Sequence, residues 1–166
     1  MPKTKQSGKQ PRSTAGTGFG DSKSSPKESS GSKLEAYINS IRGTKITKTK
    51  LRNEIQNILF DGATEEPEIG KWYFFEYDPK FRDMLKMWDQ FPFIRVLEKK
   101  SKGHILGANL HYLKTNTRLN AINKNSVPNV ALHYYIPKRA DNIFFEVEEA
   151  DVQLMSQLPI EKFHRK

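Results

Sequence analysis

Apolar residues recur at helical spacing between residues 34 and 60. Gaps of four and three residues separate the first apolar positions and predict a short amphipathic helix through Leu34, Ile38 and Ile41. Gly43 ends this helix, and Thr44 or Thr47 can cap a second one. The apolar stripe of the second helix consists of Leu51, Ile55, Ile58 and Leu59.

Two helices this short cannot bury their apolar stripes alone. They must pack on the following domain of the same chain, which is the default expectation, or on a neighbouring subunit. On the second alternative, Leu51, Ile55 and Ile58 would form an assembly interface.

Strand-like segments dominate the chain after an acidic, breaker-rich connection at residues 61–70. Aromatic and β-branched runs predict five short strands at residues 71–78, 93–98, 104–112, 130–136 and 143–147. Gly107, inside the third of these, indicates a bulge or a close backbone approach. A helix is expected at 114–125, and a short helix or turn at 149–158. The pattern predicts a mainly β (α+β) fold, namely a small SH3-like antiparallel barrel, with an OB-type barrel as the alternative.

Residues 1–33 differ from the rest of the chain in composition. They are rich in Ser and Gly, and their seven Lys and Arg residues outnumber two acids. Such a segment cannot bury enough apolar area to offset the entropy of ordering it, so we expect a disordered basic arm. The chain then divides into this arm (1–33), a helical connector (34–62) and a small β-barrel domain (68–166).

The whole chain is basic, with a net charge of +9 and a pI near 9.6. This balance favours a polyanion such as double-stranded DNA, or an acidic protein surface, as partner. Basic residues gather in the arm and in two turns between predicted strands. The candidate nucleic-acid-binding residues are Lys3, Lys5, Lys9, Arg12, Lys99, Lys100, Lys102, Lys138 and Arg139.

Single-stranded nucleic acid would also need exposed aromatic side chains on which bases stack. The candidates are Tyr77, Trp88, Phe91 and Tyr112, although most aromatic residues of a small domain fill its core. Lys114 and Arg118 add positive charge on the predicted helix.

Several classes of protein do not fit the sequence. The chain has no cysteine, which excludes disulfides, thiolate nucleophiles and Cys-ligated zinc. It has no glycine-rich phosphate loop and no HExxH motif. No apolar run is long enough to span a bilayer, and no apolar core follows the charged N-terminus as in a secretory signal. We therefore expect no cofactor, no metal, no small-molecule substrate and no membrane partner.

Two further features could carry catalysis or metal binding. His111 would neighbour His133 if their strands paired, and a two-histidine metal site would then be conceivable. Arg95 lies on the strand face opposite Ile94 and Val96, where a small-barrel nuclease could carry an arginine. Packed histidines and an outward-facing strand charge are the simpler interpretations.

Acidic residues also cluster in the loop after the first strand, at Asp78, Asp83 and Asp89. Paired carboxylates can bind a metal or transfer protons. Here they alternate with Lys80, Arg82 and Lys86, so we expect local salt bridges on a solvated loop. No residue is assigned a catalytic role.

Four blocks of sequence form a distinctive pattern. They are Gly-Lys-Trp-Tyr-Phe-Phe-Glu-Tyr-Asp-Pro-Lys (70–80), Trp-Asp-Gln-Phe-Pro (88–92), Leu-Gly-Ala-Asn-Leu-His-Tyr-Leu (106–113) and Leu-Pro-Ile-Glu-Lys-Phe (158–163). In this order they resemble a family of small virion-associated proteins of large contractile-tailed bacteriophages. The resemblance implies a minor structural or DNA-end-associated protein and carries over no catalytic residue.

Three functional hypotheses follow. The leading one is a non-enzymatic virion component of the capsid, neck or tail. It would dock in multiple copies on other virion proteins, its arm would contact DNA or an acidic protein surface, and it would lie in the host cytoplasm before assembly. The second is a free DNA- or RNA-binding module, such as a DNA-end-protecting protein. The third is a toxin-type small-barrel ribonuclease that uses Arg95.

Overall fold

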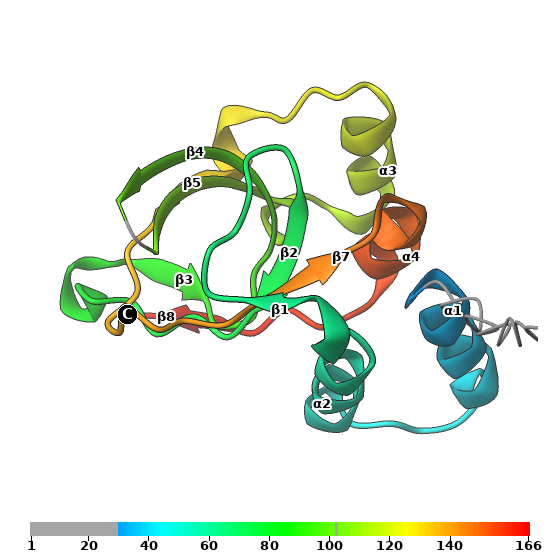
Figure 1. Ribbon diagram of the computed structural model, residues 1–166. Helices are drawn as coiled ribbons and strands as arrows, with labels where there is room; N and C mark the ends of the chain where they lie inside the picture. Colours follow the sequence, from blue (N-terminus) through cyan, green and yellow to red (C-terminus); the bar gives the residue numbers. More distant parts are fainter. Residues whose placement is uncertain (1–29, 102) are drawn as a thin grey trace, which may run out of the picture.

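The computed structural model describes residues 30–101 and 103–166 (Figure 1). Its helices are α1 (Ser30–Ile41), α2 (Lys48–Ile58), α3 (Thr115–Asn123) and α4 (Val152–Gln157). Its strands are β1 (Ala63–Thr64), β2 (Trp72–Phe75), β3 (Met87–Asp89), β4 (Phe93–Ser101), β5 (His104–Asn109), β6 (Leu132–Tyr135), β7 (Phe144–Val147) and β8 (Phe163–Arg165). All five predicted strands are present, and the predicted basic arm lies almost entirely outside the described residues.

The strands form one antiparallel sheet and one separate ribbon. The sheet has the order β1-β7-β2-β4-β5-β6, while β3 pairs only with β8. The mixed α and β fold is thereby confirmed. Register shifts in β4, between Val96 and Glu98 and between Lys99 and Ser101, interrupt its pairing with β5. The edge strands β1 and β6 pair with β7 and β5 and not with each other, so no closed barrel is found and the SH3-like prediction is not confirmed.

Strand β2 is buried on both faces, which explains its unbroken aromatic run. Trp72 and Phe74 point into a core that the sheet shares with the helices. Tyr73 and Phe75 point into a second core together with Phe144 and other residues of the curved sheet. The sheet is therefore packed on both sides.

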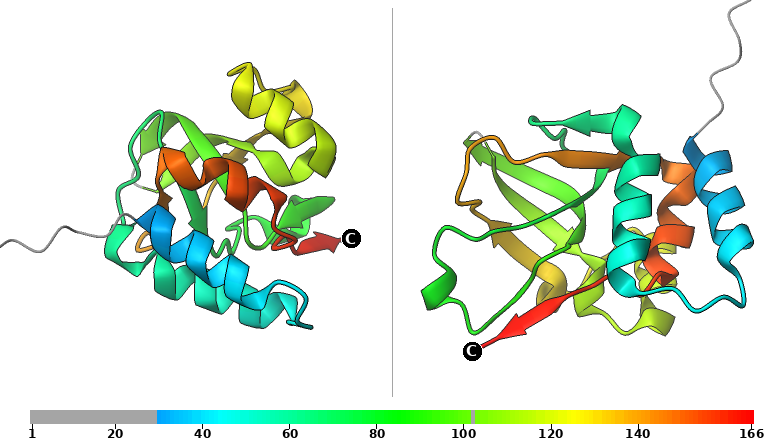
Figure 2. Two further views of the ribbon diagram at one scale, coloured as in Figure 1. Left: turned by 90° about the vertical axis from the view of Figure 1, so that its right-hand side faces the viewer. Right: turned by 90° about the horizontal axis from the view of Figure 1, so that it is seen from below.

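Helices α1 and α2 pack on the same chain, on the side of the sheet where α3 and α4 also lie (Figures 1 and 2). Leu51 and Ile55 are buried in the core shared with β2, and Ile58 is half-buried against it. Leu51 and Ile55 are therefore core residues and not an exposed assembly interface, because the sheet offers the apolar face that α2 needs. Thr47 is the N-cap of α2, since its side chain accepts a hydrogen bond from the Lys50 N–H at 3.2 Å.

Gly107 marks a close approach between β5 and β4. A Cβ atom at this position would lie 2.6 Å from Cδ1 of Ile94 and 3.1 Å from its Cβ. Only glycine leaves room for Ile94, which is fully buried. The sequence prediction of a close backbone approach is confirmed.

Asp151 is a buried carboxyl group beneath α1 whose Oδ2 has no hydrogen-bond partner among the described residues. Burial, followed by the charges of Glu148 and Glu35, raises the pKa of Asp151 from 3.8 to about 6. The folded state therefore binds more protons than the unfolded state between these two values. This group makes the protein less stable as pH rises through that range.

We expect Asp151→Asn to raise the free energy of unfolding at pH 8 by about 1–2 kcal/mol and to change it little at pH 4. The amide keeps the shape of the side chain and removes the buried charge. Urea unfolding at both pH values measures the effect, with the exposed neighbour Glu149→Gln as the control. An equal gain at both pH values would refute the charge explanation.

Candidate nucleic-acid interface

Exposed basic residues gather at the end of the molecule opposite α1, where the β4–β5 hairpin, the loop before β3 and the C-terminal strand meet (Figures 1 and 2). We call this surface the basic end. It consists of Lys80, Arg82, Lys86, Lys99, Lys100, Lys138, Arg139, Arg165 and Lys166.

Backbone contacts bring four segments of the basic end together. Pro79 forms an isolated β-bridge with Pro137, and the Lys138 N–H donates to the Asp78 carbonyl at 2.7 Å. Gly103 in the hairpin turn lies against Pro137. The C-terminus joins the loop before β3, because the Lys166 N–H donates to the Lys86 carbonyl at 3.1 Å. These contacts place the two turns predicted to bind nucleic acid beside the loop at 78–87.

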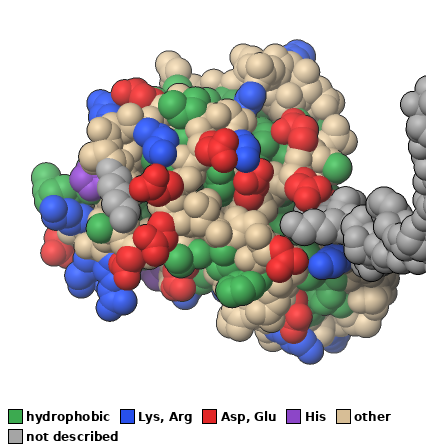
Figure 3. Space-filling model, in the orientation of Figure 1, with side chains coloured by type: hydrophobic (Ala, Val, Ile, Leu, Met, Phe, Trp, Pro, Cys, Tyr) green, Lys and Arg blue, Asp and Glu red, His purple; other side chains and the backbone are tan. Residues whose placement is uncertain are grey.

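The charge balance of this surface is strongly positive. Segments 78–87, 99–101, 137–141 and 164–166 contain nine Lys and Arg against three Asp, a formal side-chain charge of +6. Figure 3 shows Lys and Arg side chains at this end of the visible face, with acidic groups beside them. Such an array binds phosphates through several separate contacts, each of which releases counterions.

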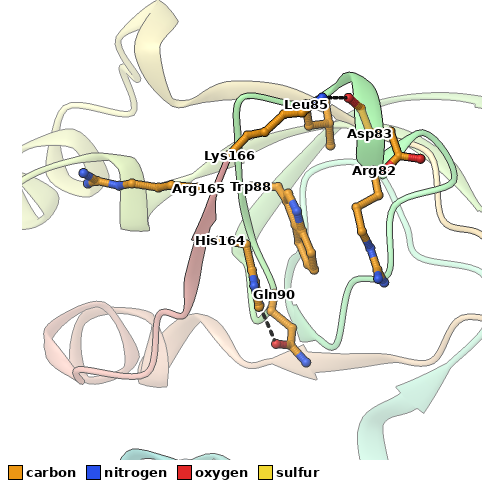
Figure 4. Close-up of a pocket in the computed structure, with 8 residues that line it drawn as sticks. All are labelled: Arg82, Asp83, Leu85, Trp88, Gln90, His164, Arg165 and Lys166. Carbon is orange, nitrogen blue, oxygen red and sulfur yellow. Dashed lines mark hydrogen bonds between the residues drawn. The ribbon is translucent and has the colours of Figure 1, made fainter.

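Strands β3 and β8 hold an aromatic pair inside this end. The rings of Trp88 and His164 stack with centroids 4.3 Å apart and an angle of 15° between their planes. The guanidinium carbon of Arg82 lies 5.5 Å from the Trp88 ring, toward the other side of the indole in Figure 4. These residues line a pocket of about 430 Å³, which Leu85 and Lys166 also help to line.

Hydrogen bonds of the lining residues keep this pocket in shape. His164 Nε2 lies 2.8 Å from Gln90 Oε1, and the Gln90 amide donates to Glu76 Oε1 at 2.9 Å. Lys166 Nζ donates to the Asp83 carbonyl at 2.6 Å (Figure 4). These contacts join the loop at 82–85, which lines one side of the pocket, to the C-terminal strand, which lines the other.

Asp89, the last residue of β3, is buried and fixes the β3–β8 ribbon to the rest of the protein. Its Oδ1 accepts hydrogen bonds from the N–H groups of Phe91 and Lys162 at 3.1 and 3.0 Å. Its Oδ2 accepts from Asn109 Nδ2 at 3.3 Å and lies 2.6 Å from His111 Nδ1. Burial by itself raises the pKa of Asp89, but the hydrogen bonds from His111 and the two N–H groups, with the proximity of His111, lower it below 3.8.

The sequence indicated one solvated cluster of acidic residues in this loop, and the structure shows that its three aspartates lie in different environments. Asp78 does form the expected local ion pair, with Arg82. Asp83 is exposed, whereas Asp89 is buried and faces the interior. The prediction was wrong for Asp89, because β3 turns its side chain toward Asn109 and His111, which are distant in sequence.

Of the four candidate stacking residues, only Trp88 lies in the pocket. Tyr77 is buried and meets Trp88 edge-on, while Phe91 packs against the core shared with the helices. Tyr112 stacks on His133 with ring centroids 3.9 Å apart. Arg118, one of the two cations noted on the predicted helix, is buried and donates to the Ser156 carbonyl at 2.9 Å.

The structure describes four of the nine predicted nucleic-acid-binding residues. Lys99, Lys100, Lys138 and Arg139 are exposed at the basic end. The arm residues and the hairpin lysine lie outside the described residues: Lys3, Lys5, Lys9, Arg12 and Lys102. Sequence reasoning missed Arg165, Lys166 and His164, and the only signal for them was the basic run at the C-terminus.

The other candidate chemical groups serve structural contacts. Arg95 Nε donates to the Gly70 carbonyl at 3.0 Å and its Nη1 donates to Asn125, so it joins β4 to the α3–β6 loop. His133 pairs in register with Gly107 and not with His111, because β5 ends at Asn109 and His111 lies in the 3-10 turn that follows it. The geometry of Arg95 gives no support to the ribonuclease alternative, and that of the histidines none to a two-histidine metal site.

Within residues 30–101 and 103–166, no group of three or more His, Asp or Glu residues is arranged to hold a metal ion. None of the helices in these ranges has the length and apolar character that crossing a membrane requires.

One comparison with known proteins identifies a family. The family described as "Phage T4 terminal DNA protecting protein" matches residues 36–127, which is more than half of the 166 residues. The match includes the second half of α1, all of α2, the strands from β1 to β5, and α3. No curated protein and no solved structure matches the chain. On the strength of the family match, this chain belongs to the phage T4 terminal DNA protecting protein family.

Proposed function

We propose that this protein binds the ends of linear double-stranded phage DNA and shields them from exonucleases. The family match supports DNA ends as the target, because the family description names terminal DNA protection. The observation that carries the proposal is the basic end itself, where nine cations are exposed and three of them, Arg82, Arg165 and Lys166, line the pocket that contains Trp88. The cations would hold the phosphates of the last turn of the duplex.

Protection by binding needs no chemical step of the protein's own. A protein that occupies the terminal backbone blocks an exonuclease that must begin at a free end. The role is therefore non-enzymatic, in line with the protective role that the family description states. The basic arm would extend the contact along the duplex through Lys3, Lys5, Lys9 and Arg12.

Protection of linear DNA against a processive double-strand exonuclease tests the proposal. Reversing four charges of the basic end, as Lys99→Glu, Lys100→Glu, Lys138→Glu and Arg139→Glu, should reduce protection at least tenfold, because each reversed cation removes a phosphate contact and the counterion release that comes with it. The matched control reverses four exposed charges on or beside the helices: Arg42, Lys45, Lys50 and Lys124. Equal losses in both variants, or no protection by the wild-type protein, would refute the proposal.

We further propose that the protein is a minor virion component. A protein bound to the ends of DNA as that DNA is packaged is carried into the particle at a low copy number set by the number of ends. Other virion proteins that face the DNA end would then be its neighbours. Quantitative proteomics of purified particles is expected to find it, and its absence from particles would contradict this part of the proposal.

A further inference from the structure

We infer that the Trp88 pocket receives a single nucleobase from the end of a DNA strand, between the indole of Trp88 and the guanidinium of Arg82. This inference rests on the proposed function and names the part of the site that would distinguish an end from the interior of a duplex. It assigns to the pocket a stacking role that the phosphate-binding cations cannot perform.

The two flat groups that would enclose the base, the guanidinium of Arg82 and the indole of Trp88, already lie near each other. The Arg82 guanidinium carbon lies 5.5 Å from the Trp88 ring, and His164 stacks on Trp88 at 4.3 Å. One side of the indole is therefore occupied by a fixed ring and the other by a side chain that is 57% exposed. Arg82 can swing outward to admit a base and then stack on it, because guanidinium planes stack well on aromatic faces.

Trp88 itself is held as a rigid platform. Its ring meets Tyr77 edge-on at 6.2 Å, and His164 is fixed by its contact with Gln90 at 2.8 Å. The next residue, Asp89, fastens the ribbon to the interior. A stacking surface that is positioned before binding loses little conformational entropy when the base arrives.

The surroundings suit a nucleotide better than a neutral aromatic ligand. Lys166 lines the pocket, and Lys86 lies next to it through its backbone bond with Lys166. Both cations can hold the phosphate that follows the base along the strand. The pocket volume of about 430 Å³ lies within the usual range of small-molecule sites.

A DNA end is where a base can enter such a pocket at low cost. Every internal base is stacked on both faces and paired, so its extrusion requires the breaking of two stacks and a base pair. A terminal base is stacked on one face only, and an unpaired terminal base can leave the stack without the breaking of a base pair. The pocket would thus favour ends of any sequence, because stacking does not read base identity.

The test uses the full-length protein and duplexes that carry 2-aminopurine, whose fluorescence falls when it stacks on an indole. One duplex has 2-aminopurine as its last base and another has it at the centre. The same sequence closed by a hairpin at each end is the reference without ends. Affinity for open and closed DNA is measured at the same salt concentration.

With the wild-type protein we expect quenching of the terminal probe, none of the central probe, and tighter binding to open than to closed DNA. Trp88→Leu should abolish the quenching and lower the preference for open DNA about tenfold. Trp88→Phe keeps a ring and should retain part of that preference. Arg82→Lys keeps the charge without the planar group, so it should lower the preference for open over closed DNA.

The outcomes separate this inference from the proposed function. If the wild-type protein binds open and closed DNA equally, the proposed end binding fails and the inference fails with it. If it prefers open DNA, but Trp88→Leu and Arg82→Lys both preserve the preference and the quenching, only the pocket assignment is overturned. Arg82→Lys decides the matter even if Trp88→Leu does not fold, because the Arg82 side chain is largely exposed.

Discussion

Asp89→Ala is expected to lower the free energy of unfolding by about 3–5 kcal/mol, because each buried hydrogen-bond donor that loses its acceptor costs about 1–3 kcal/mol. The Asp89 side chain accepts four hydrogen bonds, from the N–H groups of Phe91 and Lys162 and from Asn109 and His111. Alanine leaves these donors buried and unsatisfied. It also leaves a cavity where β3, β5 and β8 meet.

The pH dependence gives this prediction a second readout. The pKa of Asp89 is lower in the folded protein than its ordinary value of 3.8. Its contribution to stability is therefore fully present above pH 4 and is lost as pH falls through the lowered pKa. The gap between wild type and Asp89→Ala should narrow at acid pH for this reason.

Urea unfolding at pH 7 and at pH 3 measures both effects. Asp83→Ala is the matched control, because Asp83 is an exposed acid of the same loop and contributes to the pocket through its backbone carbonyl. The control should change stability by less than about 0.5 kcal/mol. A loss below about 1 kcal/mol for Asp89→Ala at pH 7 would show that the network does not hold the ribbon as described.

The affinity for linear duplex DNA is expected to fall about 150- to 2000-fold between 50 and 200 mM salt. This estimate takes four to six phosphate contacts and a slope of about 0.9 per contact on logarithmic axes. The basic end provides nine exposed cations, more than enough for that number of contacts. A protein that bound through a few uncharged hydrogen bonds would show a far weaker salt dependence.

Two sets of neutralising changes divide the salt dependence between the arm and the basic end. One set changes Lys3, Lys5, Lys9 and Arg12 to Gln, and the other changes Lys99, Lys100, Lys138 and Arg139 to Gln. Each set should make the slope less steep by about 0.9 for every phosphate that the protein no longer neutralises.

Neutralisation of Arg42, Lys45, Lys50 and Lys124 beside the helices is the control and should leave the slope unchanged. A slope that responds to the arm set and not to the basic-end set would place the DNA contact on the arm alone. Binding that barely depends on salt would contradict phosphate recognition altogether. Fluorescence anisotropy across a salt series provides all these measurements.

Local patterns predicted much of the fold. The apolar spacing from Leu34 to Leu59 gave both N-terminal helices, and Thr47 was among the two caps considered. The aromatic run at 71–78 was correctly identified as a strand, and Gly107 as a close approach. These features depend on periodicity and steric fit within a few residues, which are visible in a single sequence.

Closure of the sheet was beyond that kind of reasoning. Five strands of these lengths suit a barrel, but closure depends on whether the two edge strands meet. Strand β1, which has only two residues, and the ribbon β3–β8 were not predicted, because such short segments carry almost no periodic signal. The acidic segment from Asp78 to Asp89 was expected to be a solvated loop, and its end is a strand because β8 pairs with it.

The sequence by itself determined that the protein is strongly basic and lacks a recognisable catalytic motif. Four of its sequence blocks already resembled a phage protein family. Charge and motif are properties of residue identity and order, so no fold is needed to read them. Tertiary structure decided which cations act together and which aromatic ring remains accessible. Trp88, Arg82 and His164 form one pocket only because β3 and β8 pair, and Asp89 became a buried anchor for the same reason. Pairing between residues so distant along the chain is set by the packing of the whole molecule.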